Sequence, residues 1–167
     1  MAIPVVTIVG MSGSGKTTLI EKLIPQIKQK GYRIATVKHH FHAGFEIDQP
    51  GKDSWRHAQA GSDHVVIAAP DKIASYRVID KELTLDEIVK EINDVDLILV
   101  EGYKEAGMPS IEIIRGELGI QPISKPDHLI AYAANIVLNT TVPLFNLDDT
   151  NSIASFIVSL IPKSQLK

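Results

Sequence analysis

The chain has 167 residues, with 17 Lys and Arg against 20 Asp and Glu and no cysteine. This length fits one domain that buries roughly 70% of its unfolded surface. The slight negative charge argues against a general nucleic-acid partner, and the lack of cysteine excludes disulfides and thiolate metal sites. No apolar run approaches the roughly 20 residues that cross a bilayer, and the start lacks the basic region of a signal peptide. We therefore expect a single domain over residues 1–167, located in the cytoplasm and without a membrane partner.

The first predicted strand, residues 3–9, leads into a loop in which four residues separate Gly10 from Gly15, followed by Lys16 and Thr17. This spacing is typical of a phosphate-binding loop between a strand and a helix. Its glycines permit positive φ, so that backbone N–H groups can turn inward around an anion. The predicted nucleotide contacts are Ser12, Gly13, Ser14, Gly15, Lys16, Thr17 and Thr18. The alternative is a glycine-rich turn that only caps a helix, but the complete motif is far more specific than such a turn.

The roles of the two residues after Gly15 follow from their chemistry. Lys16 can reach the β- and γ-phosphates as a mobile point charge, and the Thr17 hydroxyl is a hard oxygen ligand for Mg²⁺. The helix is expected to run from about Lys16 to Lys30 and to end at Gly31, with a kink at Pro25. A second strand is expected over residues 33–38, and ligands of an open α/β sheet collect beyond the carboxyl ends of its strands.

The segment after the second strand carries three histidines, His39, His40 and His42, and then Asp48. The imidazoles either bind a metal or a phosphate, or they form only local hydrogen bonds in a solvated loop. Asp48 is a predicted Mg²⁺ ligand, directly or through bound water, and its alternative role is that of a turn residue before Pro50.

The middle of the chain predicts a short helix and a hairpin. Asp53 or Ser54 is expected to cap a helix that runs to Gly61, and residues 63–69 and 72–79 read as two antiparallel strands. The edge of this hairpin either serves dimerisation or is protected against pairing. Residues 84–87 then fit a capping box for a helix that ends near residue 93.

A buried strand over residues 95–100 is followed by Glu101 and a glycine. This pattern places a carboxylate at the edge of the sheet where the phosphates would bind. Glu101 is therefore a predicted Mg²⁺ ligand or a group that orients water. Glu101 and Lys16 are the two predicted catalytic residues. Three further strands are expected at 110–115, 127–134 and 142–145, with a loop over 116–126 and a closing helix that starts at Asp149 or Thr150. The elements predict an α/β, P-loop NTPase-like fold with three layers, a mostly parallel sheet and an inserted antiparallel hairpin.

Four motifs occur in order: the phosphate loop, Thr36–His40, Asp48–Ser54 and Val100–Lys104. With them the chain closely resembles the molybdopterin-guanine dinucleotide biosynthesis protein B family, small GTP-binding adaptors of molybdenum-cofactor synthesis, over residues 3 to about 161. The resemblance implies that the protein binds GTP with Mg²⁺, hydrolyses it slowly, forms a homodimer and associates with the guanylyltransferase that joins GMP to molybdopterin. The chain departs from the family at Asn135, where an Asp is common, and no residue is identified as the reader of guanine.

A P-loop small-molecule kinase is the alternative function. In that case Asp48 or Glu101 would accept a proton from a substrate hydroxyl while later loops close over the substrate. The arginines are scattered along the chain and do not indicate an arginine-rich lid, which favours the adaptor. They are Arg33, Arg56, Arg77 and Arg115.

Overall fold

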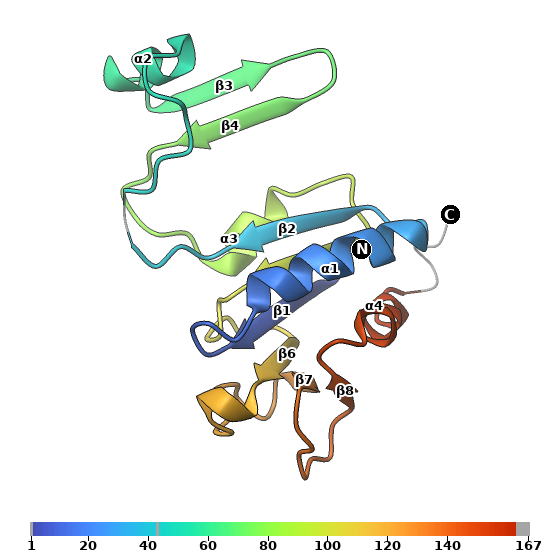
Figure 1. The fold of residues 1–167 in the computed structure, drawn as a ribbon. Coiled ribbons are helices and arrows are strands. Elements are labelled where there is room, and N and C mark those ends of the chain that lie inside the picture. Colours follow the sequence, from blue (N-terminus) through green and yellow to red (C-terminus); the bar gives the residue numbers. More distant parts are fainter. Residues whose placement is uncertain (1, 43, 163–167) are drawn as a thin grey trace. The chain divides into compact units, whose positions relative to one another are not determined.

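The computed structural model describes residues 2–42 and 44–162, and the chain divides into two compact units (Figure 1). The first, here called the sheet unit, comprises Met1–His39 and Thr84–Lys167. The second, here called the hairpin unit, comprises His40–Leu83. Within the described residues, none of the helices has the length and apolar character needed to cross a membrane.

The sheet unit is built on six parallel strands in the order β2-β5-β1-β6-β7-β8. The strands are β1 (Val5–Gly10), β2 (Ile34–Lys38), β5 (Leu97–Glu101), β6 (Ser110–Ile114), β7 (Leu129–Ala134) and β8 (Leu144–Asn146). Because all six run the same way, their carboxyl ends meet at one edge, where ligands of such sheets bind. Together with the antiparallel hairpin of the second unit, this sheet confirms the predicted fold class.

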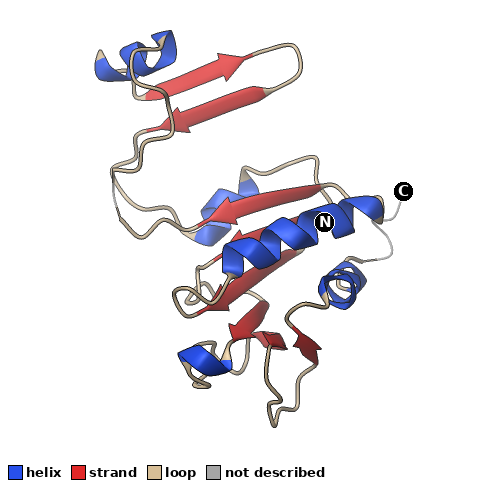
Figure 2. Ribbon diagram, viewed as in Figure 1, coloured by secondary structure: helices blue, strands red, loops and turns tan. Residues whose placement is uncertain are grey.

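Helices cover both faces of this sheet and make three layers (Figure 2). The helices α1 (Lys16–Gln29) and α4 (Thr150–Ser159) pack on one face, and α3 (Leu85–Lys90) packs on the other. Successive side chains of a strand point to opposite faces. In β5, accordingly, Leu97 and Leu99 join the core under α1 and α4, whereas Ile98 and Val100 join the core under α3.

The helix ends mostly follow the sequence signals. Thr84 forms the predicted capping box with Glu87, and the Asp149 carboxylate caps α4 by accepting a hydrogen bond from the Ser152 N–H at 3.1 Å. The first helix ends at Gln29, one residue before the predicted end, and it continues through Pro25, where the kink stays a prediction. The expected loop over 116–126 contains a short 3₁₀ turn, η1 (Gly116–Leu118).

The hairpin unit contains the helix α2 (Asp53–Gln59) and the antiparallel strands β3 (His64–Ala68) and β4 (Ile73–Arg77). The predicted hairpin is confirmed, with shorter strands. The predicted cap of α2 is wrong, because Lys52 is the N-cap residue and no side chain bonds there. Asp53 instead begins the helix, where its negative charge interacts favourably with the unpaired backbone N–H groups of the first turn.

Candidate functional site

The loop between β1 and α1 has the backbone shape that its glycines predict. Gly10, Gly13 and Gly15 all have positive φ, and Gly15 is the N-cap residue of α1 in a left-handed conformation. A Cβ on Gly10 would lie 2.7 Å from Ser14 Oγ and 2.9 Å from the Ile113 carbonyl oxygen. A larger residue therefore does not fit at the first glycine without moving β6.

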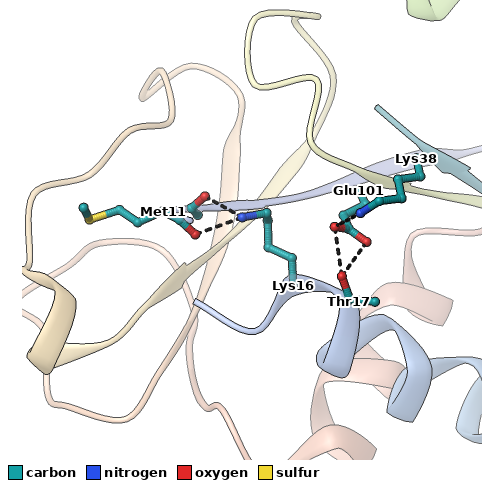
Figure 3. A network of polar contacts seen from close by, with 6 residues as sticks. Met11, Lys16, Thr17, Lys38 and Glu101 are labelled. Carbon is teal, nitrogen blue, oxygen red and sulfur yellow. Dashed lines mark hydrogen bonds and ion pairs between the residues drawn. The ribbon is translucent and has the colours of Figure 1, made fainter. Parts of the chain in front are cut away.

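Lys16 folds back over this loop. Its ammonium donates hydrogen bonds to the carbonyl oxygens of Gly10 and Met11, both at 2.9 Å (Figure 3). Partial burial is the main cause that lowers the pKa of Lys16, the nearby Glu101 carboxylate opposes this, and the Lys38 charge adds to it. The loop thus holds a cation beside backbone amides at the start of a helix, an arrangement that favours an anion.

Glu101 ends β5 and links two elements at the same place. Its two carboxylate oxygens accept hydrogen bonds from Thr17 Oγ1, both at 3.0 Å, and Oε1 forms an ion pair with Lys38 Nζ at 2.5 Å (Figure 3). The carboxylate is mostly buried, with 13% of its side chain exposed. The predicted residues Lys16, Thr17 and Glu101 are therefore brought together at one edge of the sheet.

Lys38 is a site residue that the sequence reasoning missed. In the sheet, β2 pairs with β5 in a register that sets Lys38 directly beside Glu101. The sequence offered one signal for this contact, because Lys38 and Glu101 carry opposite charges and each stands at the end of a strand. Their proximity depended on β2 and β5 being neighbours, which the sequence alone did not reveal.

The oxygen atoms at this position fit Mg²⁺. The Thr17 hydroxyl and the Glu101 carboxylate are hard ligands, and Mg²⁺ in nucleotide sites commonly takes one or two protein oxygens together with phosphates and water. Within residues 2–42 and 44–162, no group of three or more acidic, histidine or cysteine side chains is arranged to hold a metal ion. Thr17 and Glu101 supply oxygens of the kind that Mg²⁺ takes in nucleotide sites, so phosphate oxygens and water would complete the coordination of a bound Mg²⁺.

The family model described as "Molybdopterin guanine dinucleotide synthesis protein B" matches residues 5–135. The chain belongs to this family. Among its relatives, a molybdopterin-guanine dinucleotide biosynthesis adapter protein of Haemophilus influenzae is 37% identical, covering 93% of this chain and 88% of the relative. The adapter protein of Escherichia coli strain K12 is 34% identical over 96% of this chain and 95% of its own.

Solved structures agree with this family assignment. A crystal structure of molybdopterin-guanine biosynthesis protein B matches with a TM-score of 0.73 and 32% identity, covering 94% of this chain and 99% of the other. A crystal structure of Bacillus subtilis MobB matches with a TM-score of 0.76 and 25% identity, covering 96% and 99%. The fold of the protein B family thus extends over nearly the whole chain.

Arg115 is a second residue whose place the sequence did not show. It follows β6 directly, and its Nε donates a hydrogen bond to the Ser14 carbonyl oxygen at 2.8 Å. Its guanidinium also packs against Gly15, because a Cβ on that glycine would lie 3.2 Å from Arg115 Nη2. One of the arginines that look scattered in the sequence therefore contacts the glycine-rich loop.

The other predicted loop residues differ in burial. Ser12, Gly13 and Thr18 are exposed, whereas Ser14 is buried. Within the described residues, Ser14 Oγ has no hydrogen-bond partner. The exposed residues are open to a ligand, and their predicted contacts with nucleotide stay predictions.

Asp48 lies in the hairpin unit, within a local polar group. Its carboxylate accepts hydrogen bonds from Tyr76 Oη at 2.8 Å and from the Gln49 N–H at 2.7 Å. The bond from Tyr76 is the main cause that lowers the pKa of Asp48. These contacts fit the alternative role of Asp48 in a turn, and its role as a Mg²⁺ ligand stays a prediction.

The three histidines divide between the two units. His39 stacks on Tyr103 in the sheet unit, with ring centroids 4.3 Å apart. His40 and His42 lie edge-on to each other at 6.2 Å, and His40 also meets Phe45 at 5.7 Å. Local ring contacts thus account for part of this cluster, and metal or phosphate binding stays a prediction.

Proposed function

We propose that this protein is a GTP-binding adaptor in the synthesis of molybdopterin guanine dinucleotide. The observation that carries the proposal is the meeting of Thr17 and Glu101 beside Lys16, at the first turn of α1. A hydroxyl, a carboxylate and an ammonium at a helix N-terminus are the groups that a triphosphate with Mg²⁺ requires. The relatives at 37% and 34% identity, both called adapter proteins of this synthesis, support the biological role.

Binding would change the partners of two side chains. Lys16 would exchange the carbonyl oxygens of Gly10 and Met11 for oxygens of the β- and γ-phosphates, while the loop amides donate to the remaining oxygens. Thr17 and Glu101 would hold Mg²⁺, directly or through water, and the Glu101–Lys38 contact would loosen. The ion supplies positive charge that offsets the negative charge of the phosphates.

Slow GTP hydrolysis is part of the proposal. Lys16 and the loop amides would stabilise the charge that develops on the phosphate oxygens. Glu101 would orient the attacking water, but in this proposal the same carboxylate also holds Mg²⁺ together with Thr17. A carboxylate shared in this way positions water weakly, so we expect turnover to be slow without a partner protein.

The proposed partners are the guanylyltransferase that joins GMP to molybdopterin and a second copy of this chain. The hairpin unit supports an interaction role because it exposes Val66, Ile67 and Ile73 on its strands. Exposed apolar residues on a two-stranded sheet favour pairing with another protein surface.

The proposal is tested by titrating the protein with GTP and with ATP in the presence of Mg²⁺, and by measuring phosphate release with and without the guanylyltransferase. We expect GTP to bind more tightly than ATP and release to be slow. Preference for ATP, or transfer of phosphate to a small metabolite, would replace the adaptor with the kinase alternative.

Glu101→Gln tests the metal position within the same assay. Removing the negative charge is expected to raise the Mg²⁺ concentration needed for half-maximal GTP binding about tenfold, the effect of roughly 1.4 kcal/mol. Glu21→Gln, on the exposed side of α1, is the matched control and should leave the curve unchanged. An identical magnesium curve for Glu101→Gln would make Glu101 a structural residue only.

A further inference from the structure

The segments after β6 and β7 meet beside the glycine-rich loop. Arg115, directly after β6, donates to the Ser14 carbonyl oxygen at 2.8 Å. Asn135, directly after β7, accepts a hydrogen bond from the Gly116 N–H at 3.0 Å and donates through Nδ2 to Glu117 Oε2 at 2.8 Å. Figure 1 shows η1, which contains Glu117, at the same edge of the sheet as the loop before α1.

The direction of a bound nucleotide follows from the strand order, and this step rests on the proposed function. The Thr17–Glu101 contact marks the metal side of the site, and it lies toward β5. On the other side of β1 come β6 and β7. With its β- and γ-phosphates at Lys16 and Thr17, a nucleotide would extend its nucleoside away from Glu101, toward the segments that follow β6 and β7.

Glu117 has the chemistry to meet a base there. Its side chain is 58% exposed, and besides the bond from Asn135 it lies 3.6 Å from Arg115 Nη1. A carboxylate has about four acceptor positions, so these contacts leave it able to accept more hydrogen bonds. Guanine presents two parallel donors, N1–H and the 2-amino group, whereas adenine presents an acceptor at N1 and no donor at C2.

We propose that Glu117, oriented by Asn135 and Arg115, selects guanine by accepting hydrogen bonds from its N1–H and 2-amino group. The bond from Asn135 turns the carboxylate, so Asn135 is a positioning residue. Arg115 touches both Glu117 and the glycine-rich loop, so it connects the base position to the phosphate position. The same hydrogen bond from Asn135 is the main cause that lowers the pKa of Glu117.

The test is a change of base preference in Glu117→Gln. A carboxamide offers one acceptor and one donor, which match N1–H and the 2-carbonyl of xanthine. We expect GTP affinity to fall at least tenfold and affinity for xanthosine triphosphate to rise at least tenfold, with ATP unchanged. Glu105→Gln, an exposed residue of the sheet unit paired with Lys125, is the control and should keep the wild-type preference.

A second variant separates base selection from folding. Glu117→Ala should lose the preference for GTP over inosine triphosphate, which lacks the 2-amino group, without gaining affinity for xanthosine triphosphate. In either variant, a loss of affinity that is equal for GTP, inosine triphosphate and xanthosine triphosphate would overturn the assignment of Glu117 and leave the proposed function standing. GTP binding as tight as that of the wild-type protein in Glu117→Gln would have the same consequence. If the wild-type protein binds no nucleoside triphosphate, both the inference and the proposed function are overturned.

Discussion

The two units differ in how they treat apolar side chains. The sheet unit buries a continuous core between the sheet and α1 and α4, and a second core under α3. Within the described part of the hairpin unit, Val65 is the one buried apolar residue. Its exposed large apolar residues are Phe41, Phe45, Ile47, Val66, Ile67, Ile73, Val78 and Ile79.

This difference indicates that the sheet unit provides the stability of the fold and that the hairpin unit provides a surface for interaction. Burial of apolar surface is the main favourable contribution to folding, so the buried cores of the sheet unit stabilise that unit. A two-stranded hairpin is marginal alone in water, and the apolar residues it exposes gain free energy only against another surface. We therefore expect changes in the sheet unit to affect binding and folding, and changes in the hairpin unit to affect association.

The largest expected effect comes from Lys16→Ala. Loss of the ammonium removes charged hydrogen bonds to phosphate, on the order of 3 kcal/mol, so GTP affinity should fall about 100-fold. Calorimetry measures this, and Lys22→Ala on the exposed face of α1 is the control. The variant should keep the wild-type melting temperature within a few degrees. Unchanged GTP binding would remove Lys16 from the site.

The next effect concerns folding of the sheet unit. Glu112 lies in β6 with 1% of its surface exposed, and its carboxylate accepts hydrogen bonds from the N–H groups of Ile123 and Ser124 at 2.7 and 3.0 Å. In Glu112→Gln, one of these backbone N–H donors would face the side-chain NH₂ group, which is also a donor, and its hydrogen bond would be lost. We expect a loss of about 2 kcal/mol in the free energy of unfolding, measured by urea denaturation.

Tyr132 gives this second prediction an internal check. Burial is the main cause that raises its pKa, and the Glu112 charge adds to it. The pKa of Tyr132 should therefore decrease in Glu112→Gln, as followed by phenolate absorbance. The control variant Glu21→Gln should change neither the free energy of unfolding nor the pKa of Tyr132. If Glu112→Gln unfolds at the wild-type urea concentration, the two hydrogen bonds contribute nothing to stability.

A smaller effect is expected for association through the hairpin unit. Ile73→Lys places a charge on β4, where the isoleucine is 72% exposed, and should weaken the proposed homodimer about tenfold in sedimentation experiments. Ile120→Lys, at a residue of the sheet unit that is 60% exposed, is the matched control and should leave association unchanged. Equal sedimentation of both variants would place the dimer surface elsewhere.

The smallest effect is local to Asp48 and Tyr76. Because the hydrogen bond lowers the pKa of Asp48, its stabilising contribution is present above the ordinary value of 3.8 and is lost as pH falls through the lower folded value. Tyr76→Phe should raise the pKa of Asp48 toward 3.8, as measured by NMR titration of the carboxyl carbon. An unchanged titration would show that Tyr76 is not the cause.

Much of the fold and part of the site could be predicted because their signals are local. The spacing of Gly10, Gly15 and Lys16 specifies a strand, a loop and a helix within a few residues, and the capping box at Thr84 depends on residues three apart. Glu101 was recognisable because an acidic residue ends a buried apolar run. Local backbone geometry and side-chain periodicity determine such features, so the sequence was sufficient for them.

Other contacts depended on the order and register of strands that are distant along the chain. Lys38 meets Glu101 because β2 and β5 are neighbours, and Arg115 meets Ser14 because β6 lies beside β1. Glu112, between isoleucines in a strand, is buried because the segment with Ile123 folds over it. Pairing between distant segments is set by the packing of the whole sheet, so only the tertiary structure decided these contacts.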